Sequence, residues 1–231
     1  MPYDDLKNNI GQVLQRAKIK VSRVYLWHSN NRLVNAAVSG ILPWMRYLLV
    51  TDGLIQRLNP DEIKAVVAHE AAHIRHRHLL LAMVSLGLPF GFSFLLLHVQ
   101  QDLQLSLSVA QQCLVVALVF AAWVLFQRML SRLMEHQADI EACLILGHQD
   151  DSIDSSAAAL YCSSLEKMSG GDDGKDWWHP AISLRTQLVQ NVSDQPESLS
   201  DFNQRTAAFS RLVCGTVAVL TLANIGLVLI R

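Results

Sequence analysis

The stretch His69-Glu70-Ala71-Ala72-His73 decides the interpretation of this chain, because it places two imidazoles four residues apart. A helix start precedes it, since Asn59 is a good N-cap and the proline after it suits the first helical position. A helical turn takes about 3.6 residues, so His69 and His73 share one face and can bind one metal ion. Glu70 lies about 100° around the helix, where it can act on a metal-bound water without being a ligand. This is the arrangement of a zinc peptidase.

A pair of helical histidines can also occur without binding anything, so the rest of the chain has to supply the missing parts. Two histidines leave a catalytic zinc one protein ligand short. In the metzincins the third ligand is a histidine six residues after the second, with a glycine between them. Here Leu79 stands at the sixth position and His76 at the glycine position, which excludes that class.

A second helical pair offers the third ligand. Residues 135–139 read Glu-His-Gln-Ala-Asp, which again puts two functional side chains one turn apart. Glu135 can be the ligand, and Asp139 can accept the outward N–H of a ligand histidine and fix its tautomer. Two acidic residues on a solvated helix face would give the same pattern, but the apolar residues around them favour a packed helix. The predicted zinc ligands are His69, His73 and Glu135, with water as the fourth.

With these motifs the chain resembles the membrane zinc endopeptidases of the HtpX and CAAX-prenyl-protease type. The resemblance rests on further elements that span about residues 20 to 190. They are Asn35-Ala36 followed by Gly40, Leu49 to Leu54, Glu135 to Ala142, and His179-Pro180 with Arg185 six residues after the histidine. That family normally has transmembrane helices before the catalytic helix, and here there are none. We therefore expect upstream segments to be missing, either naturally or because the chain is a fragment.

The resemblance implies roles for two regions outside the zinc motifs. A substrate peptide would add as a strand along the edge near Asn35 and Ala36. His179 and Arg185 would steady the oxyanion or orient the site, although a His-Pro turn and a surface arginine are common without such a role. Arg185 could instead pair with a buried carboxylate such as Asp139.

The composition indicates a membrane protein. Hydrophobic residues make up 51% of the chain and charged residues only 17%, which is low for a soluble domain. Three uncharged stretches, 79–99, 105–126 and 212–230, are long enough to cross a bilayer. A buried core helix is the alternative for each, and their length favours spanning. The net charge of −1 and the lack of a basic, aromatic-rich patch give no sign of nucleic-acid binding.

The arginines predict a topology for the first two spans. Those that flank the spans are Arg75, Arg77, Arg128 and Arg132. The loop 98–104 between the spans has no lysine or arginine. The positive-inside rule therefore places residues 1–78 and 127–211 in the cytoplasm. Both candidate ligand helices then lie on one side of the membrane, as a shared zinc ion requires.

The predicted fold is a mainly α-helical integral membrane protein with a small β-sheet beside the zinc helix, that is, a zincin-like α+β catalytic domain. Residues 1–18 look like an amphipathic helix, and strands are expected at 21–27, 33–38 and 46–51. The predicted parts are peptidase segments 1–78 and 127–211, a transmembrane hairpin 79–126, a polar linker 193–201 and a third transmembrane helix 212–230. Trp177 and Trp178 could anchor at the membrane interface or pack over the site.

The predicted function is that of a zinc metalloendopeptidase, with one Zn²⁺ per chain, that cuts peptide or protein substrates at the cytoplasmic face of the inner membrane. Glu70 would be its general base, and membrane protein quality control or processing would suit it. One alternative is a sensor that reports a ligand by cutting a partner, for which the chain offers few external residues. The other is an inactive zinc-stabilised scaffold, but a structural zinc needs no base and normally has four protein ligands. The sequence names neither the substrate nor the oligomeric state.

Overall fold

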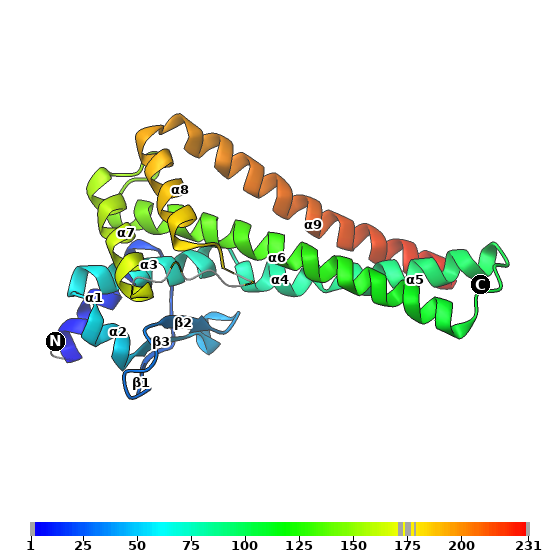
Figure 1. Cartoon of the computed structure of the whole chain (residues 1–231), viewed down its shortest axis with the longest axis horizontal. Coiled ribbons are helices and arrows are strands. Elements are labelled where there is room, and N and C mark those ends of the chain that lie inside the picture. Colours follow the sequence, from blue (N-terminus) through cyan, green and yellow to red (C-terminus); the bar gives the residue numbers. More distant parts are fainter. Residues whose placement is uncertain (1–2, 171–172, 174–176, 178, 230–231) are drawn as a thin grey trace. The chain divides into compact units, whose positions relative to one another are not determined.

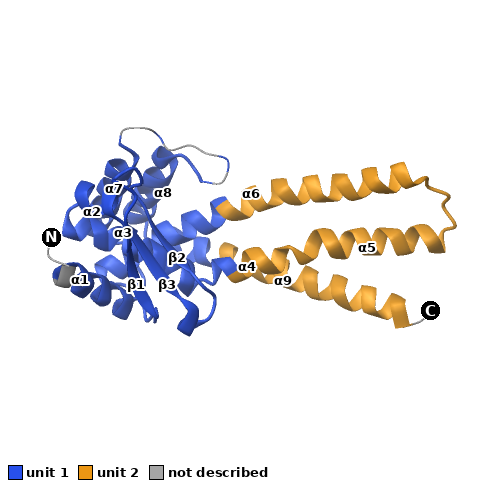
Figure 2. Cartoon of the chain, turned by 90° about the horizontal axis from the view of Figure 1, so that it is seen from below, with its two compact units in different colours: residues 1–79, 132–204 blue, residues 80–131, 205–231 orange. Residues whose placement is uncertain are grey.

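The structure of the chain is a computed structural model that describes every residue except 1–2, 171–172, 174–176, 178 and 230–231 (Figure 1). Trp178 therefore lies outside the described residues. The chain divides into two compact units, which Figure 2 colours separately. Unit 1 comprises residues 1–79 and 132–204, and unit 2 comprises residues 80–131 and 205–231. The assignment of residues 1–78 and 127–211 to a peptidase domain, and of 79–126 and 212–230 to the membrane, stays a prediction.

Unit 1 combines a small sheet with several helices. In chain order it contains α1 (Tyr3–Arg16), β1 (Arg23–Trp27), β2 (Ala36–Ser39), the 3-10 helix η1 (Pro43–Met45), β3 (Tyr47–Thr51), α2 (Asp52–Arg57), α3 (Pro60–Arg75), the end of α6 (Val109–Gly147), α7 (Ser155–Ser169), α8 (Ile182–Asp194) and the start of α9 (Glu197–Leu229). The N-terminal helix and the three strands match the predicted segments, with ends that differ by a few residues.

The sheet of unit 1 has β3 in its middle. β1 pairs with β3 in parallel and β2 pairs with it antiparallel, so β2 is an edge strand. Helix α3 packs against β2, α1 and α7. Its residues Val67, Ala68 and Ala71 are fully buried, and they share a hydrophobic core with Leu48 and Val50 of β3. The predicted zinc helix is thus a central element of unit 1, held on several sides.

Unit 2 contains most of α4 (His78–Ser85), all of α5 (Gly87–Asp102), the first part of α6 and most of α9. By length and composition, three helical stretches among the described residues could cross a membrane: His78–Asp102, Val109–Gly147 and Glu197–Leu229. Each contains most of one predicted span. The predicted fold class is therefore confirmed, since the chain is mainly helical with one small sheet and three candidate membrane helices.

The second predicted span is helical from Val109 onward. Helix α6 begins at Val109 rather than at residue 105. Ser108 and Gln111 form a reciprocal cap, because the Ser108 N–H donates to Gln111 Oε1 at 2.9 Å and the Gln111 N–H donates to Ser108 Oγ at 3.4 Å. From there α6 continues unbroken to Gly147, so the apolar stretch and Glu135 belong to one helix.

The predicted polar linker at 193–201 is wrong, because most of it is helical. Helix α8 ends at Asp194 and α9 already begins at Glu197. A proline directly before α9 suits a helix start, and the charge of Glu197 in the first turn favours the positive end of the helix dipole. The polar residues at the start of α9 therefore suggested a linker where the first turns of a helix lie.

The first predicted span is interrupted where α4 ends at Ser85 and α5 begins at Gly87. Pro89 explains the break, because it lacks the N–H that would donate to the Ser85 carbonyl in a continuous helix. The indole Nε1–H of Trp123 on α6 donates to that carbonyl instead, at 3.0 Å. A neighbouring helix thus satisfies the backbone group that the proline leaves without its usual donor.

This arrangement predicts a coupling between two positions. Trp123→Phe should lower the melting temperature of the protein in detergent, because loss of the donor to Ser85 costs about 1 kcal/mol. In a Pro89→Ala background the same change should cost much less, since an alanine at position 89 supplies a backbone N–H. Equal losses in both backgrounds would show that the indole does not serve this carbonyl.

Candidate metal centre

The helix that carries the two histidines has its start fixed by a capping box. Asn59 Oδ1 accepts the N–H groups of Asp61 at 3.0 Å and of Glu62 at 2.9 Å, and Glu62 Oε2 accepts the Asn59 N–H at 2.9 Å. The other oxygen of Glu62 accepts from Lys167 on α7. These bonds fix the start of α3 and connect it to α7, so the histidines further along the helix sit on a rigid backbone.

The side chains of His69 and His73 converge with Glu135 of α6. The two Nε2 atoms are 3.1 Å apart, and each lies 3.5 Å from one carboxylate oxygen of Glu135. In a tetrahedral zinc site with bonds of about 2.0–2.2 Å, neighbouring ligand atoms are ~3.3 Å apart. The three side chains therefore fit one zinc ion. Three protein ligands leave the fourth position open, as in catalytic rather than structural sites.

A buried polar cluster holds the outward nitrogen of His69. Asp139 Oδ1 lies 3.2 Å from His69 Nδ1, and the Tyr161 hydroxyl lies 2.9 Å from the same nitrogen. The hydroxyl donates its proton to Asp139 at 2.5 Å. Both groups can then only accept from His69, so Nδ1 carries a proton and a metal would bind at Nε2.

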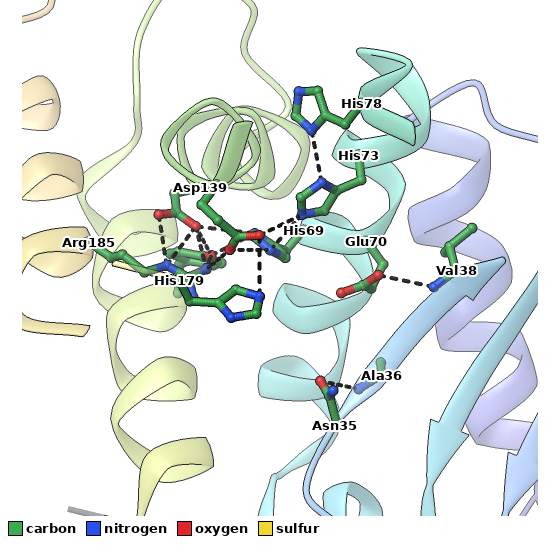
Figure 3. A network of polar contacts seen from close by, with 12 residues as sticks. Asn35, Ala36, Val38, His69, Glu70, His73, His78, Asp139, His179 and Arg185 are labelled. Carbon is green, nitrogen blue, oxygen red and sulfur yellow. Dashed lines mark hydrogen bonds and ion pairs between the residues drawn. The ribbon is translucent and has the colours of Figure 1, made fainter. Parts of the chain in front are cut away.

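The two residues inferred from the late motif both approach Glu135 (Figure 3), and Arg185 Nη2 lies 3.5 Å from Glu135 Oε2. Arg185 is buried and donates to both oxygens of Asp139, with a shortest contact of 2.6 Å. This is the alternative that the sequence left open for Arg185. The His179 side chain is half exposed, and its Nε2 lies 3.8 Å from Glu135 Oε1. Trp177, two residues before it, is exposed.

One oxygen of the Glu70 carboxylate bonds to the edge strand of the sheet (Figure 3). Its Oε2 accepts the backbone N–H of Val38 on the edge strand β2 at 3.1 Å. Desolvation, opposed by the charge of His69 and assisted by that of Glu135, raises the pKa of Glu70 to about 7. A bound cation would lower this pKa again. A carboxylate that titrates near neutral pH is suited to take up and release a proton.

The two histidines differ in protonation. Burial disfavours the charged form of His69, but hydrogen bonds to Asp139 and Glu135 outweigh it and raise the pKa of His69 to about 9. Burial and the nearby charge of His69 lower the pKa of His73 to about 3. Metal ligands must be unprotonated at the binding nitrogen. His69 therefore has to release a proton when it binds a metal, whereas His73 does not.

The predicted substrate residues lie at the edge strand. Ala36 is the first residue of β2, and its N–H donates to the Asn35 side chain at 2.9 Å. The N–H groups of Ala36 and Val38 both bond to side chains outside the sheet, because alternate residues of a strand direct their backbone groups to the same side. The free edge of β2 therefore borders Glu70. A role of Asn35 and Ala36 in substrate binding stays a prediction.

The sequence analysis missed two residues of the site. Tyr161 comes from α7, 92 positions after His69, and no spacing pattern links the two. His78 Nδ1 lies 2.8 Å from His73 Nδ1. Two further histidines, His76 and His78, follow the motif within five residues. They were the available signal for His78.

Comparisons with known proteins identify the family. The sequence model of peptidase family M48 matches residues 2–198, which is most of the chain. The chain belongs to peptidase family M48. The resemblance seen in the motifs is thereby confirmed, and the M48 family implies a metal cofactor, in agreement with the three converging side chains.

Individual M48 relatives match over shorter stretches. Protease HtpX of Legionella pneumophila is 41% identical over 86 residues, which are 37% of this chain and 30% of that protein. A protease HtpX homolog of Thermoplasma acidophilum is 28% identical over 168 residues, 70% of this chain and 51% of that protein. The crystal structure of S. mikatae Ste24p aligns with a TM-score of 0.49 at 19% identity, covering 80% of this chain and 49% of that one. The chain thus spans about half or less of the length of these relatives. With its three apolar helices, this M48 chain is a multi-pass membrane protein.

The choice of third ligand can be tested by paired substitutions on α6. Glu135→Ala should lower zinc affinity far more than Glu141→Ala, because Glu141 pairs with Arg75 and His76 away from the ligand atoms. Asp139→Asn should fall between them, with a loss of about 10–100-fold. Zinc content measured after dialysis against a chelator checks the order. Equal retention by the Glu135 and Glu141 variants would remove Glu135 from the ligand set.

The contact of Arg185 predicts a loss of stability. Arg185→Ala leaves the Asp139 carboxylate buried without its cation, which typically costs about 3–5 kcal/mol. The melting temperature should therefore fall clearly and zinc should be lost. Adding Asp139→Asn should restore part of the stability, since no charge is then buried alone. A wild-type melting temperature with a reduced kcat would instead support the role in the transition state that the resemblance implies.

Proposed function

We propose that this chain is a membrane-bound zinc metalloendopeptidase. The observation that carries the proposal is the convergence of His69, His73 and Glu135 at the spacing of a tetrahedral zinc site. Glu70 follows the first ligand directly and faces the free edge of a strand. A structural zinc site would need neither an open position nor a carboxylate beside it. Membership of peptidase family M48 supports the same function.

The residues of the site would each have a distinct role. Zinc, when bound, would lower the pKa of a water molecule and polarise the scissile carbonyl. Glu70 would accept a proton from the attacking water at its carboxylate and later return it to the departing amine. The Val38 N–H would hold this carboxylate in place before substrate binds. His179, close to Glu135 and half exposed, would donate to the developing oxyanion.

The substrate would be a peptide or protein in extended conformation. Among the described residues, strand β2 pairs with β3 on one side only, and the N–H groups of Ala36 and Val38 lie on its other side. A peptide that adds to this edge would replace the contacts of these groups with the side chains of Asn35 and Glu70. Such backbone pairing is largely independent of side chains, which suits the processing or removal of membrane proteins of varied sequence.

The general base can be tested without disturbing the metal. Glu70→Gln keeps the size of the side chain but cannot accept a proton, so zinc content should match that of the wild type. Activity against casein should fall by roughly two to four orders of magnitude. Glu141→Gln is the matched control, because that carboxylate binds Arg75 and His76 and should leave activity unchanged. Near-wild-type cleavage by Glu70→Gln would remove Glu70 from the mechanism.

We propose that the zinc site faces the cytoplasm, because arginines flank the first two apolar helices on the side of the zinc motifs. In a background without the four native cysteines, a cysteine at Gln101 should react with a membrane-impermeant thiol reagent outside intact cells. A cysteine at Asp150, in the exposed turn after α6, should react only after the membrane is opened. Labelling at Asp150 in intact cells would invert the orientation.

A further inference from the structure

His78 and Gln137 form a chain of contacts that ends on a candidate zinc ligand. His78 Nδ1 lies 2.8 Å from His73 Nδ1, and His78 Nε2 lies 3.1 Å from Gln137 Oε1 (Figure 3 shows the first contact). The His78 ring is buried, with 3% of its surface exposed. Gln137 comes from α6, two residues after Glu135. The outward nitrogen of the second ligand histidine is thus occupied by another side chain, as is that of the first.

A break in the helix brings His78 to this position. In a continuous α-helix five residues turn the chain by about 500°, so residue 78 would lie about 140° around the axis from His73. Helix α3 instead ends at Arg75, and Arg77 adopts a left-handed conformation with φ 56°. The chain turns there and α4 begins at His78. A non-glycine residue in this conformation is strained by roughly 1 kcal/mol or more, which the contacts of His78 help to offset.

The glutamine at one end of this series of contacts and the metal at the other require the same position for the proton of His73. Gln137 Oε1 can only accept, so the proton of His78 lies on Nε2. His78 Nδ1 is then an acceptor, and the hydrogen bond to it requires a proton on His73 Nδ1. Independently, a metal bound at His73 Nε2 requires that nitrogen to be bare, which also puts the proton on Nδ1. The bond to Gln137 and the binding of a metal therefore require the same tautomer of His73.

We propose that His78 and Gln137 are positioning residues that hold His73 in the tautomer and orientation required for zinc. The proposal rests on the metal site of the proposed function. It assigns the two ligand histidines different supports: His69 is backed by the charged Asp139, and His73 is backed by a neutral His78–Gln137 pair.

The experiment measures zinc affinity of the full-length protein in detergent by competition with a chromophoric chelator. His78→Leu should weaken zinc binding about 10–100-fold, the usual effect of losing a partner of a ligand histidine. His78→Asn should stay within a few-fold of the wild type, since an amide oxygen can occupy the place of Nδ1 and accept from His73. His76→Leu is the matched control, because His76 bonds to Glu141 and not to a ligand, and it should leave the affinity unchanged.

A second readout reports on the proton itself. In the cobalt-loaded protein, the Nδ1–H protons of the two ligand histidines should give separate, paramagnetically shifted NMR signals. The signal of His73 should exchange slowly with water in the wild type and in His78→Asn, and quickly in His78→Leu, while that of His69 stays unchanged. Gln137→Leu removes only the hydrogen-bond partner of His78 Nε2 and leaves the contact between His78 and His73. It should show the same acceleration with a smaller loss of affinity, and it replaces His78→Leu should that variant fail to fold.

Equal zinc affinity in His78→Leu and His76→Leu would overturn the proposal. An equal loss of zinc affinity in His78→Asn and His78→Leu would also overturn it. So would an unchanged exchange rate of the His73 proton in His78→Leu and Gln137→Leu. These readouts are separate from catalysis. A wild-type protein that binds zinc in this way but cuts no casein would contradict the peptidase activity and leave the role of His78 intact. A wild type that binds no zinc would contradict both.

Discussion

The burial of the Asp139 carboxylate is the constraint on which the rest of the metal centre depends. No part of this side chain reaches solvent, and a charge in such surroundings must be paired and hydrogen-bonded. Its partners come from three other helices: His69 from α3, Tyr161 from α7 and Arg185 from α8. In this packing of the helices on α6, all three partners meet the charge. The same packing directs His69 Nε2 toward the position shared with His73 and Glu135.

The outward supports of the two histidines make the site asymmetric. A carboxylate behind His69 raises the basicity of that imidazole, whereas the neutral ring behind His73 does so much less. The capping box of Asn59 and Glu62 fixes the backbone of both ligands from the start of α3. Differences between the ligands therefore arise from their side-chain partners and not from their position along the helix.

The chain's local patterns predicted the parts of the site that depend on one helix. The spacing of His69 and His73, and that of Glu135 and Asp139, follows from the helical repeat alone. Tyr161 could not be found in this way, because its contact with His69 requires α7 to pack beside α3. The position of His78 depends on the left-handed conformation of Arg77, which an arginine does not signal. Hydrophobicity could not predict the first residue of α6, because it marks a membrane segment, whereas the Ser108–Gln111 cap marks a helix start.

The order of these residues along the chain has a consequence for biosynthesis. Arg185 follows Asp139 by 46 residues, so the ribosome delivers both zinc motifs before the guanidinium that neutralises the buried carboxylate. A nascent chain at that stage already holds every candidate zinc ligand, but Asp139 cannot yet be enclosed and the support of His69 is incomplete. The centre can close only after translation has passed α8. On the proposed function, the peptidase would thus stay latent until α8 has been made.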